Sequence, residues 1–445
     1  MKICRKLILP SLLPLTLLVV CVAPRVSAQG LSKNDRETGL MMLDRVKDEI
    51  KKNYFDPNFK GVNLDEKFKA AEEKIKQATS NGQLFGLIAQ AVISLDDSHT
   101  VFIPPQRALR VSYDWRIQMV GDTCYITGVK PGTDAEAKGL KAGDILHVID
   151  GYKPTRENFW LLNYLYNLLQ PRPSVEVTVQ SPGGEPRKVA YNASTRQGKK
   201  QLDFTANGLL DYYDLLRESQ EYDRINAHHF ESFGKELLIW KMPQFDLTKS
   251  QTDEMMDKAR GYKTLIIDLR DNGGGYEETL LRLIGNLFDH DVKLGDIKRR
   301  KETKPLIAKA RGADYFKGQL ILLVDSNSGS ASEVLSRVVQ LEKRGTVIGD
   351  RTAGAVMRSK GYGFHVGVDT IVPYGVSITD ADVVMTDGAS LEKVGVTPDK
   401  VMLPTGAELR AQSDTVLAYA ASLAEVKLEP EKAGALFPTK WKLKP

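Results

Sequence analysis

The sequence predicts a multidomain α/β protein with an N-terminal helical cap, a small β-rich domain and an α/β core on a mostly parallel sheet. A chain of 445 residues is too long for one ordinary hydrophobic core. Its N-terminal part follows helical spacing, its middle contains short alternating runs, and its C-terminal half contains continuous apolar runs between helical patterns. Such runs are typical of parallel strands buried on both faces.

Composition is that of a globular protein, with 42% hydrophobic and 27% charged residues. The formal net charge is +5, and it falls to about +1 without the four basic residues of the leader, so we expect no nucleic-acid partner. Cys124 would be the only cysteine of the mature chain, which excludes an internal disulfide. No convincing metal-ligand spacing is present, and we expect no cofactor. The oligomeric state stays open.

Residues 1–28 have the pattern of a secretory signal peptide. A basic start precedes an apolar stretch over residues 7–23, and small residues end at Ala28, where we expect cleavage. An uncleaved membrane anchor is the alternative, and Pro10 and Pro14 with the short apolar run disfavour it. The sequence therefore predicts a periplasmic or secreted protein without stable membrane insertion after cleavage.

Residues 29–105 are predicted to form an N-terminal helical region. Apolar residues recur at helical spacing in residues 43–54, and a second helix is expected behind an Asn63 cap. Residues 83–95 give a third helix. Three short amphipathic helices predict a cap rather than a large core.

Residues 106–191 change to short β-rich runs around a helix with glycine turns. The stretch "GLKAGDILHVIDG" resembles a PDZ domain, in which Gly139 and Gly143 permit tight turns. A PDZ-like domain implies binding of an extended peptide as an added strand. The segment before "WRIQMV" departs from that pattern, because it lacks the glycine of the usual carboxylate-binding loop.

Residues 192–235 are expected to be a polar connector, within a C-terminal unit that spans residues 192–445. From Glu236 onward strands and helices alternate, with a helical tail expected to pack into the core rather than to form an interface. The predicted buried strands are "ELLIWKM", "TLIIDLR", "QLILLVD" and "GTVIGD".

Ser330 is predicted to lie between a strand and a helix. The helix N-terminus, with its free amides and dipole, favours an oxyanion there. The alternative is a capping serine, because Glu333 follows three residues later and completes a capping box.

The glycine loop "DLRDNGGG" ends the second buried strand. We expect the amide of Gly274 or Gly275 to form an oxyanion hole with that of Ala331. A phosphate cradle would need the lysine and hydroxyl residue of a P-loop, which are missing. A tight structural turn is the third possibility.

His99 is the one histidine of six that follows a polar cluster and precedes apolar residues, in "LDDSHTVF". A lone histidine is more often structural, and its position alone does not assign it a function.

Together these fragments resemble one family, the tail-specific and carboxyl-terminal processing proteases and their tricorn-like relatives. The motifs are "DDSHTVF", "GLKAGDILHVIDG", "IIDLRDNGGG", "SGSASE", "GDRTAG" and "DGASLEKVGVTPD", in the order of the family. The resemblance covers nearly the whole mature chain and implies a crotonase-like α/β core with Ser330 as nucleophile.

The resemblance also distinguishes two branches. Ala355 stands where the Ser-Lys branch has its lysine base, and Lys360 lies further along the chain. The tricorn-like branch instead uses a serine–histidine pair and a glutamate, which match Ser98, His99 and Glu392. The implied protein is a secreted serine endopeptidase that cleaves extended polypeptides.

Two other functions remain open at this point. One is a catalytically inactive, PDZ-bearing peptide-binding or scaffold protein on the protease fold, which the missing lysine would favour. The other is a small-molecule enzyme of the crotonase type, whose glycine loops would stabilise an enolate.

Overall fold

The computed structural model describes residues 31–106, 109–197, 227–366, 372–438 and 441, so the predicted leader lies outside the described residues. Three helices open the described chain: α1 (Lys33–Asn53), α2 (Leu64–Ile75) and α3 (Asn81–Ile93), with a short 3₁₀ turn at Phe59–Gly61. The predicted Asn63 cap is confirmed, since its side chain accepts from the N–H of Glu66. No helix in the described ranges is long and apolar enough to cross a bilayer.

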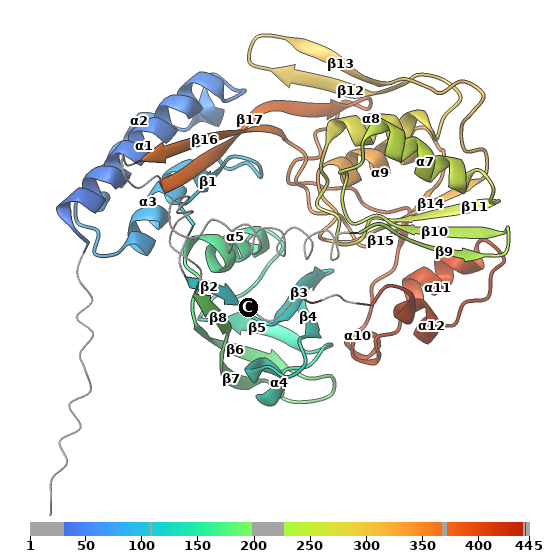
Figure 1. The fold of residues 1–445 in the computed structure, drawn as a ribbon, viewed down its shortest axis with the longest axis horizontal. Coiled ribbons are helices and arrows are strands. Elements are labelled where there is room, and N and C mark those ends of the chain that lie inside the picture. The colour runs from blue at the N-terminus through green and yellow to red at the C-terminus, as the bar shows by residue number, and fades with distance from the viewer. Residues whose placement is uncertain (1–30, 107–108, 198–226, 367–371, 439–440, 442–445) are drawn as a thin grey trace, which may run out of the picture.

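The three helices share their core with strands from the other end of the chain. Strand β17 (Val372–Met385) pairs with β1 (Val101–Ile103), β12 (Val292–Arg299) and β16 (Arg358–Val366), and β13 (Thr303–Ala308) pairs with β12. Buried side chains of all three helices belong to one hydrophobic cluster that also contains Val376 and Ile378 of β17. Figure 1 shows these helices beside the long β16–β17 hairpin. The helical cap is therefore tied to the C-terminal half of the chain.

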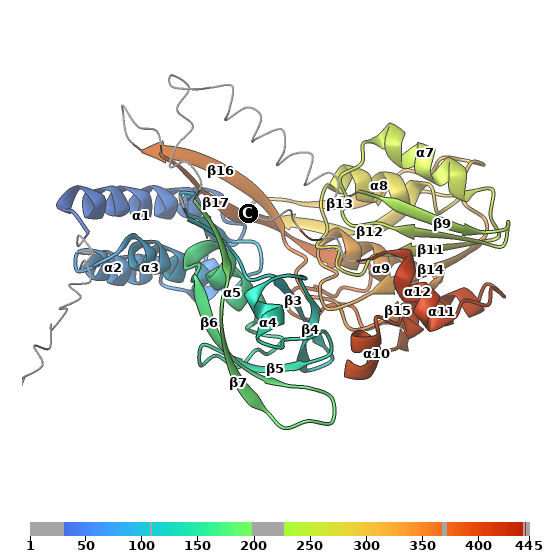
Figure 2. The same ribbon diagram turned by 60° about the horizontal axis from the view of Figure 1, so that its bottom comes forward.

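The middle of the chain forms a five-stranded antiparallel sheet in the order β3-β4-β5-β6-β7. Gly139 and Gly143 adopt φ values of +78° and +84°, as their predicted turns require. Beside β3 lies a helical segment that the sequence analysis missed (Figure 2). It consists of α5 (Phe159–Tyr164) and the π-helical turn that follows (Leu165–Leu169), together called the α5 segment. The remaining elements are β2 (Leu109–Ser112), β3 (Trp115–Val120), β4 (Thr123–Val129), α4 (Asp134–Ala137), β5 (Ile145–Ile149), β6 (Ser174–Gln180), β7 (Arg187–Asn192) and β8 (Ser194–Gln197).

The C-terminal sheet has the order β18-β15-β14-β11-β10-β9, and every pair is parallel except β9–β10. Helices cover both faces, as predicted, with α11 and α12 on one side and α7 to α9 on the other (Figure 1). The predicted connector was wrong at both ends, because β8 and β9 lie within it. The elements of this part are β9 (His229–Phe233), β10 (Leu237–Lys241), α7 (Lys249–Ala259), β11 (Thr264–Asp268), α8 (Glu277–Gly285), β14 (Gln319–Val324), α9 (Ala331–Leu341), β15 (Thr346–Gly349), β18 (Lys400–Val401), α10 (Gly406–Ala411), α11 (Thr415–Ser422) and α12 (Pro430–Leu436).

The β3–β4 turn docks on the carboxyl ends of β14 and β15. Asp350 accepts from the N–H of Gly121 and pairs with Arg156, and the Ser326 hydroxyl donates to the carbonyl of Met119. The side chains of Arg156 and Asp350 are only 9% and 10% exposed. The antiparallel domain is thus attached at the carboxyl ends of the core strands, where the loop that carries Ser330 begins.

We expect Asp350→Ala to lower the thermal unfolding midpoint by the equivalent of about 3 kcal/mol. The guanidinium of Arg156 then loses its buried carboxylate and keeps only two backbone carbonyls and the exposed Asp122 as partners. Asp65→Ala is the matched control, since Asp65 pairs with Lys47 and Lys51 on the exposed surface and should leave the midpoint nearly unchanged. Calorimetry on both variants checks this, and equal midpoints would contradict it.

Candidate active site

Ser330 lies where the turn after β14 enters α9, as the sequence predicts. Its backbone has φ +51° and ψ −115°, a left-handed conformation that costs free energy for a residue with a side chain. Its N–H donates to the carbonyl of Ala355 (2.7 Å) and to the carboxylate of Glu333 (3.0 Å). The glutamate contact of the alternative capping box is therefore present, and it binds the backbone of Ser330.

The glycine loop approaches Ser330 closely. A methyl group on Gly274 would lie 2.6 Å from the Cβ of Ser330 and 2.9 Å from the N of Ala331, so no larger residue fits there without movement. The N–H of Gly274 donates to the side-chain oxygen of Asn272 (2.8 Å). Within the described chain the amides of Ala331 and Gly275 have no backbone or side-chain acceptor. Two of the three candidate oxyanion donors are thus available.

His99, Ser98 and Glu392 form one hydrogen-bonded group across 294 positions of sequence. The Ser98 hydroxyl donates to Glu392 Oε2 (2.9 Å) and lies 2.7 Å from Nδ1 of His99. Because that hydroxyl hydrogen points to the carboxylate, its oxygen accepts from His99, which places the imidazole proton on Nδ1. The Nε2 lone pair is left to accept a proton, and no described residue forms a hydrogen bond with it.

One peptide group connects this relay to Ser330. The carbonyl of Ala355 accepts from the N–H of Ser330, and the N–H of Val356, in the same peptide unit, donates to Glu392 Oε2 (3.0 Å). With standard peptide dimensions, the Glu392 carboxylate lies within about 8 Å of the Ser330 nitrogen. No hydrogen bond joins the Ser330 hydroxyl to His99 among the described residues, and both residues are partly exposed.

Burial lowers the pKa of His99 below its usual value, and the carboxylates of Glu392 and Asp97 oppose this effect. The imidazole is therefore neutral near pH 7, which is the form that a general base requires.

Glu333 and Asp97 are the buried carboxylates that sequence analysis missed as parts of the site. Glu333 accepts from four donors: the N–H groups of Ser330, Gly354 and Ala355 and the hydroxyl of Thr352. Burial raises the pKa of Glu333 to about 7, although these donors favour its ionised form. The capping-box spacing was the only sequence signal for Glu333, and it was interpreted as local.

Lys360, the lysine closest in sequence to position 355, lies on β16. Its side chain is exposed, with the ammonium 5.7 Å from the ring centre of Tyr362. A lysine acts as a base only when desolvation lowers its pKa, and this position offers no such burial.

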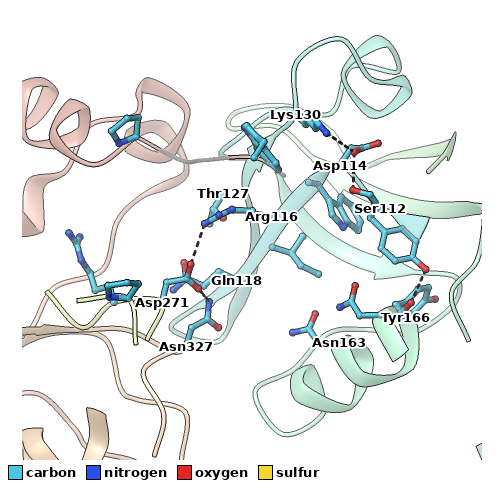
Figure 3. Close-up of a pocket in the computed structure, with 18 of the residues that line it drawn as sticks. Ser112, Asp114, Arg116, Gln118, Thr127, Lys130, Asn163, Tyr166, Asp271 and Asn327 are labelled. Atoms are coloured by element: carbon cyan, nitrogen blue, oxygen red, sulfur yellow. Dashed lines mark hydrogen bonds and ion pairs between the residues drawn. The ribbon is translucent and has the colours of Figure 1, made fainter. Parts of the chain in front are cut away.

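A cavity of about 820 Å³ lies between the antiparallel domain and the core. Figure 3 shows its wall of β3, with Arg116 and Gln118, opposite Asn163 and Tyr166 of the α5 segment. On the core side it is lined by Asp271, which bridges Arg116 of β3 and Asn327 of the Ser330 loop. The cavity does not reach Ser330 itself, but Asn327 lies only three positions before it.

The fold and these groups define a class of protein, a serine-type hydrolase with an α/β core. Residues 237–402 match the model of Peptidase family S41. The chain is 27% identical over 380 residues to "C-terminal processing peptidase, chloroplastic" from Tetradesmus obliquus, covering 79% of this chain and 74% of that protein. It is 25% identical over 357 residues to a "Carboxyl-terminal-processing protease" from Picosynechococcus, covering 77% of this chain and 78% of the relative.

The fold is also similar to a solved structure of mature CPAF. The TM-score is 0.61 at 15% identity, and the match covers 84% of this chain and 94% of that one. The comparisons identify a serine-type peptidase: residues 237–402 match family S41, as the sequence motifs suggested, and the chain is similar to carboxyl-terminal processing proteases.

We expect Glu333→Gln to lower kcat/KM by about 100-fold, because the amide nitrogen would face two donors and misplace Ser330 and the 354–355 backbone. In the unsubstituted enzyme activity should fall as pH drops through about 7, where the carboxyl becomes protonated and can no longer accept from all four donors. Glu342→Gln, an exposed change at the end of the same helix, is the control for steady-state assays. Wild-type kinetics in Glu333→Gln would contradict the assignment.

Proposed function

We propose that the protein is an exported serine endopeptidase that cleaves extended polypeptides, with Ser330 as nucleophile and His99 as general base. The observation that carries this proposal is the Glu392–Ser98–His99 relay, which leaves Nε2 as the proton acceptor. In it, Nε2 takes the Ser330 hydroxyl proton while Oγ attacks the scissile carbonyl carbon. The imidazolium then gives that proton to the leaving amine, and a water molecule deprotonated by His99 releases the acyl group.

The amides of Ala331 and Gly275 would stabilise the oxyanion, each contributing roughly 2.7–4 kcal/mol in comparable enzymes. Gly274 would not donate to the oxyanion, because its N–H already donates to Asn272. Its contribution would be the absence of a side chain, which lets the glycine loop lie close to Ser330. Ser98 and Glu392 hold the imidazole and favour its charged form.

We assign residues 106–191 to a PDZ-like domain and residues 192–445 to a crotonase-like protease core, with residues 29–105 as the helical region. Export would follow from the leader at residues 1–28, with a periplasmic or secreted location. In support of peptide binding, β3 is an edge strand of its sheet and lies along the cavity. A substrate added to β3 would leave this groove next to the Ser330 loop.

The alternative is an inactive peptide-binding protein on the same fold, and a serine-reactive fluorophosphonate separates the two. We expect labelling of the wild-type enzyme at Ser330, none in Ser330→Ala, and little in His99→Ala, because the hydroxyl then lacks its base. Absence of labelling in the wild type would support the binding protein.

Lys360→Ala should retain most activity, because its exposed ammonium is not the proposed base. Inactivity of Lys360→Ala would refute the histidine assignment.

We expect Asn163→Trp to raise KM for long polypeptides by about tenfold or more while short peptides are cleaved normally, because the indole would fill the groove between β3 and α5. Steady-state kinetics on a long and a short substrate with the same cleavage site measure this. An equal effect on both substrates would assign the groove a structural role.

A further inference from the structure

The turn that carries His99 is organised around one buried carboxylate, Asp97, which is 3% exposed. Its Oδ1 accepts from the N–H of Thr100 (2.7 Å), the N–H of His99 (3.1 Å) and the hydroxyl of Thr379 (2.7 Å). Its Oδ2 accepts from the hydroxyl of Tyr54 (2.7 Å). The donors come from the end of α1, from β17 and from the turn itself, so Asp97 joins three segments beneath the imidazole.

Asp97 has four neutral donors and, in the described part of the chain, no lysine or arginine within ion-pair distance. Its neighbour Asp96 is exposed and pairs with Lys393 instead. An uncompensated buried charge acts over a longer range than a surface ion pair, because little water screens it. The carboxylates that act on the His99 imidazole are Glu392 and Asp97, and Asp56 acts on Tyr54 together with them.

We propose that Asp97 is a positioning residue for the catalytic base, which fixes the backbone of His99 and, as a second carboxylate beside Glu392, stabilises its imidazolium form. This inference rests on the proposed role of His99. The hydrogen bond from the His99 N–H sets where the ring leaves the chain, while Ser98 and Glu392 set its rotation. The negative charge of Asp97 is held in place by Tyr54 and Thr379, so it needs no reorganisation when the imidazole takes the proton.

Asp97→Asn tests the charge without removing the anchors. The amide oxygen can keep the three donors of Oδ1, and the amide nitrogen can donate to the oxygen of Tyr54. Since a carboxylate favours the protonated imidazole, its removal should lower the pKa of His99 by about one pH unit. We expect kcat to fall about tenfold with KM nearly unchanged.

The first readout is an NMR titration of the His99 ring in a Ser330→Ala background, assigned by its loss in His99→Asn. This signal excludes the titration of Glu333, which would contribute to a pH–rate profile. An unchanged His99 titration in Asp97→Asn overturns the proposal. A different outcome is a titration that shifts in Asp97→Asn while kcat stays unchanged both in Asp97→Asn and in His99→Ala. That result would support the influence of Asp97 on the imidazole and refute His99 as the base.

Two further variants complete the design. Asp96→Asn removes an exposed charge one position away and should leave both the titration and kcat as in the wild type. Tyr54→Phe keeps the Asp97 charge and removes one anchor, so kcat should fall without a lower pKa of His99. A lower pKa in Tyr54→Phe would contradict the charge effect, even if Asp97→Asn failed to fold.

Discussion

The arrangement of this site depends on the peptide group between Ala355 and Val356. Its carbonyl holds the N–H of Ser330, and its N–H holds the Glu392 carboxylate that orients Ser98 and His99. A peptide group is planar and rigid, so a fixed unit rather than a flexible side chain connects the Ser330 backbone to the Glu392 carboxylate. Glu333 adds a second constraint, because it binds the N–H groups of Gly354 and Ala355 together with that of Ser330.

This backbone role explains how alanine can occupy position 355. The carbonyl oxygen makes the contact to Ser330, and any residue can supply it. In the proposed mechanism His99 replaces the lysine as proton acceptor. His99 is far away in sequence and is placed by the pairing of the adjoining strand β1 with β17. Imidazole needs only a modest change of pKa to act near neutral pH, whereas an ammonium group would need deep desolvation.

Sequence patterns predicted what local periodicity determines. The buried strands β10, β11, β14 and β15 are continuous apolar runs. Helices cover both faces of their sheet, so most side chains of these strands are buried and the sequence shows no polar alternation. The α5 segment was missed because its aromatic and leucine residues, "NFWLLNYLYNLL", lack a polar face. Strand β9 was missed because it is a half-exposed edge strand, without a continuous apolar run.

The functional groups were predictable in part, for a related reason. Ser330 and the glycine loop each have a local sequence pattern, in which a buried strand is followed by a turn that leads into a helix. Ser98 and Glu392 have no such local pattern and were predicted only from the resemblance of whole motifs to the family. Asp97 and Glu333 have local explanations that conceal their long-range contacts, as an acidic turn residue and a capping glutamate. Burial separates the two interpretations, because a solvent-exposed cap would not lose water to hold several donors. Each of these carboxylates is desolvated and has its oxygens occupied by fixed donors, which is the condition under which a charge can act on a neighbouring imidazole without first reorganising.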